Sequence, residues 1–283
     1  MEIKKVGVVG AGTMGNGIAQ VFAQSGFDVV LSDVTDAILD RAVALIGGSM
    51  DRMIKKEKMT AAQKDAALKH ITKTTSLKAM ADCDIIIEAI IEDFATKKKM
   101  FEELDRVAKA CAILATNTSA ISITRIAACT KRPTDVIGMH FMNPVPVMAL
   151  VEIVRGIATS DEVYKATEDL AKKLGKTPVE VSDYPGFVAN RLLMPMINEA
   201  CYTLMEGVAT REAIDTVMKL GMAHPMGPLQ LADLIGLDIC LSIMEVLHEG
   251  FSDSKYRPCP LLKKMVTAGY LGRKTKRGFY TYE

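Results

Sequence analysis

The sequence predicts an α/β protein, with a Rossmann-type, mostly parallel sheet followed by a smaller all-helical domain. Three observations predict this fold class. Short apolar runs alternate with longer helical segments up to about Asp183, a glycine-rich turn follows the first run, and almost no strand-like run occurs beyond Tyr184-Pro185-Gly186. We therefore expect a first domain over residues 1–184 and a second over residues 185–283, which suits a chain of 283 residues.

The strands of the first domain are predicted from runs rich in valine and isoleucine. Because these runs are apolar throughout, they are typical of parallel strands that helices cover on both faces. Less helix separates the runs after His140, so we expect part of the sheet edge to be antiparallel. The predicted strands are Val6–Val9, Val29–Ser32, Asp84–Ala89, Ala112–Thr116, Val136–His140, Leu150–Arg155 and Val179–Val181.

Helical segments lie between these strands and make up most of the second domain. In the first domain an amphipathic stretch around Ile18 and Phe22 follows the glycine turn, and further helices are predicted over Asp36–Lys56, Ala61–His70, Ala95–Ala108 and Asp161–Leu174. In the second domain the predicted helices are Val188–Glu206, Arg211–Leu220, Pro228–His248 and Leu261–Ala268. One helix face there suits either the domain core or a homodimer interface, and it consists of Leu231, Leu234, Ile235, Ile239 and Ile243.

The composition is that of a soluble globular protein, with 24% charged and 49% apolar residues. With 35 basic and 34 acidic residues, nothing favours a nucleic-acid or membrane partner. No apolar segment is long enough to cross a bilayer, and no secretory signal is expected because the first strand begins almost at once. The six cysteines are scattered without a CxxC pair, which predicts reduced thiols, no metal site and a cytoplasmic location.

The glycine turn predicts a dinucleotide site. It reads Gly10-Ala11-Gly12-Thr13-Met14-Gly15 and lies between a strand and a helix. The first glycine permits the tight turn, the second lets the backbone approach a pyrophosphate, and the third lets helix and strand pack closely. Asp33 ends the next strand, where an acid binds ribose hydroxyls and repels a 2′-phosphate. We therefore expect NAD rather than NADP.

Candidate catalytic groups are expected just after the strands, because ligands of an open parallel sheet bind beyond the carboxyl ends of its strands. Of the four histidines, only His140 falls at such a position. Glu152 lies within the next apolar strand, where a buried acid needs a partner, and a turn through residues 143–146 could bring the two side chains together. A carboxylate there would fix the imidazole tautomer and stabilise its protonated form, as a general base requires.

Each of these residues also has a purely structural interpretation. His140 could be a structural histidine, and Glu152 a surface acid on an edge strand. Ser119 could hydrogen-bond the reacting oxygen, but it could equally cap a helix over Ile121–Ala128, a role that Ser122 could also fill.

The chain resembles the 3-hydroxyacyl-CoA dehydrogenase family. The resemblance rests on GAGTMG, NTSA, GMHFMNPVPVM, LVEIVRG, PGFVANR and HPMGPLQLADLIGLD, which occur in the family's order over nearly the whole chain. It is most similar to the short, single-function bacterial members that act on 3-hydroxybutyryl-CoA. The resemblance implies a helical second domain that mediates dimerisation, and NAD-linked oxidation of an (S)-3-hydroxyacyl-CoA substrate to the 3-oxo thioester.

The resemblance also implies roles for residues that match the family's motifs. His140 matches the catalytic base and Glu152 its paired acid, while Ser119 and Asn190 match the polar groups that hold the substrate. On the cofactor side the matches are residues 10–15, Asp33, Glu92, Lys97, Ser119, Asn143 and Lys274.

A basic helix end is the candidate contact for CoA. Ser49 and Lys56 fall where family members contact CoA, beside further lysines and an arginine that suit either CoA phosphates or a solvated helix end. Gly47-Gly48 lowers the helix propensity of this segment, which makes these CoA contacts less secure than the catalytic pair. One departure from the family's pattern lies elsewhere: Ala120 stands where many relatives have a second serine beside Ser119.

Two other functions fit part of the sequence. A related dehydrogenase could act on a free hydroxy acid with a lysine as its base, but no matching lysine motif occurs. A non-catalytic relative could bind NAD as a sensing module, but Ser119, His140, Glu152 and Asn190 are all present.

Overall fold

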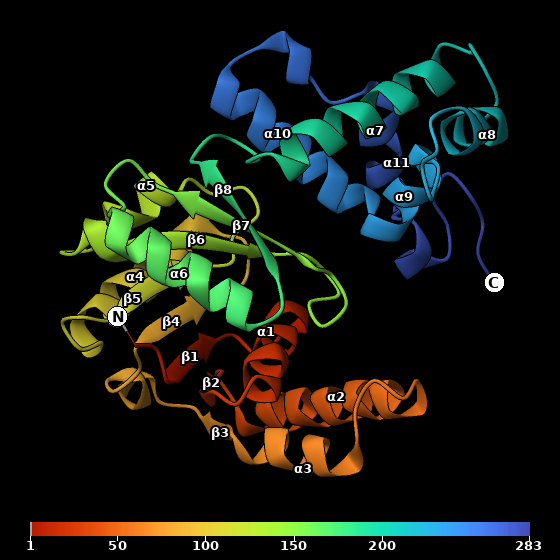
Figure 1. The fold of residues 1–283 in the computed structure, drawn as a ribbon. Helices are drawn as coiled ribbons and strands as arrows, with labels where there is room; N and C mark the ends of the chain where they lie inside the picture. The colour runs from red at the N-terminus through yellow and green to blue at the C-terminus, as the bar shows by residue number, and fades with distance from the viewer. Residues whose placement is uncertain (1) are drawn as a thin grey trace. The chain divides into compact units, whose positions relative to one another are not determined.

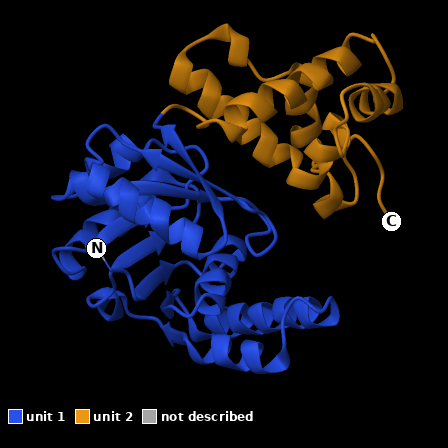
Figure 2. Ribbon diagram, in the orientation of Figure 1, with its two compact units in different colours: residues 1–183 blue, residues 184–283 orange. Residues whose placement is uncertain are grey.

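The computed structural model describes residues 2–283, and the chain divides into two compact units, residues 1–183 and 184–283 (Figure 2). Unit 1 is built on an eight-stranded sheet in the order β3-β2-β1-β4-β5-β6-β7-β8. Its strands are β1 (Lys5–Val9), β2 (Asp28–Ser32), β3 (Ile71–Thr74), β4 (Ile85–Glu88), β5 (Ile113–Thr116), β6 (Val136–Phe141), β7 (Leu150–Arg155) and β8 (Thr177–Ser182).

The helices of unit 1 follow the crossover pattern that parallel strands require. They are α1 (Thr13–Gln24), α2 (Asp36–Lys55), α3 (Ala61–Lys69), α4 (Phe94–Val107), α5 (Ile123–Ala127) and α6 (Asp161–Lys173), with short 3₁₀ turns at Leu77–Met80 and Pro133–Asp135. Figure 1 shows α6 lying across the strands, and α2 and α3 side by side.

The sheet is parallel from β3 to β6, and β7 then pairs antiparallel with β6. β8 returns parallel to β7. The expectation of a mostly parallel sheet with an antiparallel part at its edge is therefore confirmed. The reversal is local and has a simple cause, because only a turn over residues 142–149 joins β6 to β7, and a parallel partner would need a long crossover.

The two faces of β6 serve different purposes. Ile137 and Met139 join a buried apolar cluster that includes side chains of α1 and α6. On the opposite face, a Cβ added to Gly138 would lie 2.8 Å from a side-chain carbon of Ile123 in α5. Because successive side chains alternate across a strand, His140 lies on this second face. All six residues of β6 are buried.

Three parts of the chain differ from the prediction. β3 was not predicted, because it is a half-exposed edge strand with a single strongly apolar residue, Ile71. β8 runs past the predicted Val179–Val181 at both ends, where it is mostly exposed. The single predicted helix Pro228–His248 is wrong: it is two helices, separated at Gly236, whose φ of 107° no continuous helix allows.

Unit 2 is a helical cluster made of α7 (Ala189–Met205), α8 (Arg211–Gly221), α9 (Pro228–Ile235), α10 (Leu237–Phe251) and α11 (Pro260–Thr267), with 3₁₀ turns at Ser254–Tyr256 and Arg273–Thr275. Two buried carboxylates tie the last segment of the chain to it. Asp233 accepts hydrogen bonds from the backbone N–H groups of Phe279 and Tyr280, and Asp215 accepts one from the Tyr280 hydroxyl. Within residues 2–283, none of the helices has the length and apolar character to cross a membrane.

Candidate functional site

The loops that follow β1, β2, β4, β5 and β6 leave the sheet at its carboxyl-terminal edge, because these five strands are parallel neighbours. This edge therefore collects the glycine turn, Asp33, Glu92, Ser119 and the residues after His140. It is the edge at which open α/β sheets bind ligands. Most of the candidate residues of unit 1 come together here.

The glycine turn has the geometry that a pyrophosphate site needs. Gly10 has a φ of 97°, and a Cβ on Gly15 would lie 1.6 Å from the carbonyl oxygen of Gly10. At Gly12, by contrast, a Cβ would meet nothing within 4 Å, and no side chain caps the start of α1. The helix thus presents its first N–H groups beside an open backbone surface, as anion binding requires.

Asp33 is bound to the glycine turn itself. Its Oδ2 accepts a hydrogen bond of 2.6 Å from the backbone N–H of Ala11, and its Oδ1 accepts one of 2.7 Å from Val34. Asp33, which follows β2, thus holds the glycine turn that follows β1. Asp33 is also the residue for which the sequence predicts a ribose contact. Its interaction with the turn was not predicted.

His140 and Glu152 form a buried pair. They lie directly opposite each other in the antiparallel pairing of β6 and β7, so their side chains share one face of the sheet. The Nδ1 atom of His140 lies 2.7 Å from Oε2 of Glu152, and the side chains are 10% and 2% exposed. When the carboxylate accepts the Nδ1–H, the second ring nitrogen, Nε2, is the atom that can exchange a proton.

Ser119 lies in a loop that Glu92 organises. Oε1 of Glu92 accepts hydrogen bonds from the N–H of Ser119 at 2.9 Å, from its hydroxyl at 3.3 Å, and from the N–H of Ala120 at 3.2 Å. The cap of α5 is Ser122, whose side chain accepts from the N–H of Arg125. Of the two serines considered as caps, Ser122 therefore takes that role.

A buried cluster of charges lies beside this loop. Nζ of Lys97 is 2.6 Å from Oε1 of Glu88 and 3.4 Å from Oε2 of Glu92. The side chains of Lys97 and Glu88 are 1% and 0% exposed. Glu88 is not among the predicted site residues, although its sequence position resembles that of Glu152: an acid that ends an apolar strand needs a buried partner.

Asn143 is exposed in the turn after β6, at the same edge of the sheet. The other candidate residues lie elsewhere. Ser49 is half-buried on α2, which runs unbroken through Gly47-Gly48, and Lys56 is exposed at its end. Asn190 and Lys274 belong to unit 2, where Asn190 is buried in the first turn of α7 and Lys274 pairs with Asp238.

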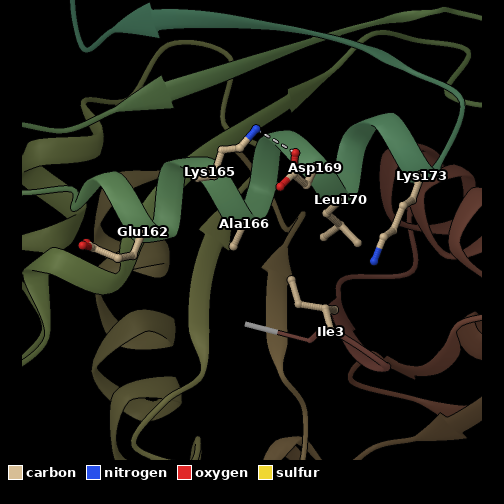
Figure 3. A pocket seen from close by; sticks show the side chains of 7 residues that line it. All are labelled: Ile3, Glu162, Lys165, Ala166, Asp169, Leu170 and Lys173. Atoms are coloured by element: carbon tan, nitrogen blue, oxygen red, sulfur yellow. Dashed lines mark hydrogen bonds and ion pairs between the residues drawn. The ribbon is translucent and has the colours of Figure 1, made fainter.

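A hollow of about 570 Å³ on unit 1 is lined by none of these candidates (Figure 3). Its walls are mostly the exposed side of α6, with Ile3 from the segment before β1, at the amino-terminal edge of the sheet. Lys165 there is already paired with Glu168 and Asp169. Within residues 2–283, no group of three or more His, Cys, Asp or Glu side chains is arranged to hold a metal ion.

Two family models match the chain. One describes the NAD-binding domain of 3-hydroxyacyl-CoA dehydrogenase and matches residues 5–184, and the other describes its C-terminal domain and matches residues 186–282. The chain belongs to the 3-hydroxyacyl-CoA dehydrogenase family. As a member of this family it is an NAD-dependent oxidoreductase, and NAD is its cofactor.

Relatives in the 3-hydroxyacyl-CoA dehydrogenase family match the chain over nearly its whole length. A 3-hydroxybutyryl-CoA dehydrogenase of Bradyrhizobium diazoefficiens is 58% identical over 99% of this chain and 96% of its own. A probable 3-hydroxybutyryl-CoA dehydrogenase of Deinococcus radiodurans is 57% identical over 98% of this chain and all of its own. The (S)-3-hydroxybutyryl-CoA dehydrogenase from Ralstonia eutropha, whose crystal structure is known, is 54% identical in sequence to this chain. The two structures superpose over the full length of both chains with a TM-score of 0.98.

Proposed function

We propose that this dehydrogenase interconverts (S)-3-hydroxybutyryl-CoA and acetoacetyl-CoA, with His140 and Glu152 as its acid/base pair. The similar proteins named above support the short-chain acyl-CoA substrate. The observation that carries the proposed chemistry is the buried 2.7 Å contact between His140 and Glu152 at the ligand-binding edge of the sheet.

The residues of the glycine turn fit the cofactor. The open surface over Gly12 and the uncapped start of α1 would receive the pyrophosphate, and Asp33 would receive the adenosine ribose. Glu92, Lys97, Ser119, Asn143 and Lys274 are the further proposed cofactor contacts. When bound, NAD accepts a hydride from the substrate or returns one to it.

In the oxidative direction, His140 takes the proton of the substrate's 3-hydroxyl group as C3 loses its hydride. In the reductive direction the imidazolium returns that proton to the forming alkoxide. Glu152 holds the ring through Nδ1 and balances the positive charge that the ring gains, so the proton moves at Nε2. We assign Ser119 and Asn190 to orienting the acyl group, and Ser49, Lys56 and Ser119 to contacts with CoA.

We also propose a homodimer that forms through unit 2, and a cytoplasmic location on the sequence grounds given above. Support for the dimer comes from exposed apolar side chains on unit 2. Leu192, Val208 and Leu220 are each at least 70% exposed. Of the five residues of the predicted interface face, Leu234 and Ile239 are exposed, whereas Ile243 is buried in the core. Light scattering coupled to size-exclusion chromatography tests the proposed homodimer. A monomer at micromolar concentration would contradict it.

A single assay tests the proposed reaction. We expect the protein to oxidise NADH in the presence of acetoacetyl-CoA. The loss of NADH absorbance measures this reaction. Free acetoacetate is the matched control, because it presents the same reacting carbonyl without CoA. Equal turnover of the free acid would favour a hydroxy-acid dehydrogenase, and no turnover of either compound would favour a non-catalytic NAD-binding protein.

A further inference from the structure

We propose that Glu88 is a positioning residue, which holds Ser119 in place through Lys97 and Glu92. Glu88 also contacts the start of this loop directly, since its backbone oxygen accepts from the N–H of Asn117 at 2.8 Å, and Thr116, which donates to Oε2, accepts from the N–H of Thr118 at 3.2 Å. The proposed connection to Ser119 itself runs through Lys97 and Glu92. Each link is a contact between two side chains, or between a side chain and the backbone, at distances between 2.6 and 3.4 Å. The inference rests on the proposed function in one respect, because it takes the position of Ser119 to matter for the reaction.

The first link is a carboxylate that is fixed on all sides. Glu88 ends β4 and is fully buried. Its Oε1 accepts hydrogen bonds from Nζ of Lys97 at 2.6 Å and from the N–H of Ile90 at 2.8 Å. Its Oε2 accepts one at 2.8 Å from the hydroxyl of Thr116, its neighbour on β5. A buried charge with this many donors has a single position.

The second link is the ammonium group of Lys97. The residue lies in the first turns of α4, which begins after the cap residue Asp93. With Nζ held by Glu88, the same group lies 3.4 Å from Oε2 of Glu92. Lys97 is therefore a buried cation between two carboxylates. One of them, Glu88, is fully buried, and the other, Glu92, is 41% exposed and also accepts a hydrogen bond from the buried hydroxyl of Thr118 through Oε1.

The third link is Glu92, whose two oxygens face different partners. While Oε2 faces Lys97, Oε1 accepts from the N–H and hydroxyl of Ser119 and from the N–H of Ala120. An exposed carboxylate that no cation oriented would rotate and exchange these donors for water. Loss of the charge on Glu88 is thus expected to loosen the loop that carries Ser119.

Loss of a buried ion pair that serves only stability would not change the loop that carries Ser119. The chain contains such a pair, which serves as a control. Arg132 and Asp105 form another largely buried pair, with a distance of 2.7 Å between Nε and Oδ1. Asp105 lies at the other end of α4 from Lys97. Glu88→Gln and Asp105→Asn therefore each neutralise one carboxylate of a buried pair that involves the same helix, and only the first lies in the proposed series of contacts.

The kinetic experiment is a double-mutant cycle between Glu88→Gln and Ser119→Ala. We expect Glu88→Gln to lower kcat/KM for acetoacetyl-CoA by about tenfold in the wild-type background and by less than about twofold in the Ser119→Ala background, since residues that act as a unit are not additive. Asp105→Asn is expected to change kcat/KM by less than about twofold. Equal effects of Glu88→Gln in both backgrounds would overturn the proposal.

A second readout does not depend on activity. Hydrogen exchange followed by mass spectrometry measures how well the N–H groups of Ser119 and Ala120 are protected. Both groups donate hydrogen bonds to Glu92. We expect faster exchange of the peptide that contains them in Glu88→Gln and unchanged exchange in Asp105→Asn. Unchanged exchange in folded Glu88→Gln would overturn the positioning role, whatever the assay shows. Absence of turnover in the wild type would instead refute the proposed function.

One further variant keeps the test decisive if Glu88→Gln does not fold. Glu88→Gln combined with Lys97→Met removes both buried charges, so neither is left without its partner. In this double variant Glu92 has also lost its cation, and the same faster exchange around Ser119 is expected. Wild-type exchange in the folded double variant would overturn the proposal.

Discussion

The Nδ1 atom of His140 lies 2.7 Å from the Oε2 atom of Glu152, within the sheet rather than on a mobile loop. The antiparallel pairing of β6 with β7 places the two residues opposite each other, so the backbone register itself sets their contact. Rigid elements hold a catalytic constellation more precisely than loops do. The reversal of one edge of the sheet is therefore what makes the proposed acid/base pair.

Replacing Glu152 tests the pairing. Glu152→Gln retains a side chain of the same size but removes the charge that balances a protonated imidazole. We expect kcat to fall by at least about tenfold, because the amide cannot balance the positive charge that the ring gains when it takes the proton. Steady-state rates at saturating substrate measure this effect. A kcat equal to that of the wild type would count against the pair.

Two alanine substitutions in the glycine turn separate folding from cofactor binding. At Gly12 the added methyl group meets no atom within 4 Å, so Gly12→Ala is expected to keep the wild-type Tm but bind NADH at least about tenfold more weakly. At Gly15 the methyl group would collide with the backbone of Gly10, so Gly15→Ala should lose more than about 3 kcal/mol of stability. Fluorescence titration with NADH and thermal unfolding check this pair. Normal NADH binding by Gly12→Ala would show that the pyrophosphate lies elsewhere.

Asp33 is expected to set the choice of cofactor. The wild type should prefer NADH to NADPH, because the carboxylate repels a 2′-phosphate. Asp33→Asn is expected to reduce that preference at least about tenfold, while its side-chain oxygen can still accept the hydrogen bond from Ala11. The ratio of kcat/KM for the two cofactors gives the answer. A wild type that prefers NADPH would show that the role of Asp33 has been misjudged.

The cysteines differ widely in expected reactivity. Burial raises the pKa of Cys83 to about 11 and that of Cys240 to about 12, whereas Cys111 is exposed. At pH 8 a disulfide reagent should therefore label Cys111 first and leave Cys83 and Cys240 unmodified until the protein unfolds. Because the folded state retains the Cys83 proton, the contribution of this thiol to stability should fall as pH rises from 9 toward 11.

Labelling kinetics in the native state and in denaturant check this assignment, with Cys111→Ser as the control that removes the fast phase. Rapid modification of Cys83 or Cys240 in the native protein would contradict the burial seen in the structure.

The sequence alone predicts the fold wherever a pattern is strong. The apolar runs of β1, β4 and β5 are buried central strands, and the structure confirms the predicted fold class. β3 escaped prediction because an exposed edge strand needs no apolar run, and the break at Gly236 escaped because the apolar spacing continues across it. Both features depend on tertiary surroundings that local patterns do not record.

The candidate site follows the same rule. The contact between His140 and Glu152 could be anticipated, because an acid inside an apolar strand must find a partner and only a short turn separates the two strands. The interactions of Glu92 and Lys97 could not be assigned from spacing, since they join the ends of β4 and β5 to α4 across the edge of the sheet. Glu88 was overlooked although it obeys the argument that identified Glu152.

The most direct test of the proposed mechanism is the turnover of His140→Gln with NADH and acetoacetyl-CoA, compared with that of the wild type. Glutamine can hydrogen-bond but cannot exchange the proton, so we expect kcat to fall by about 100-fold or more while the affinity for NADH is unchanged. A kcat near the wild-type value would remove His140 from the reaction and contradict the mechanism proposed for this enzyme.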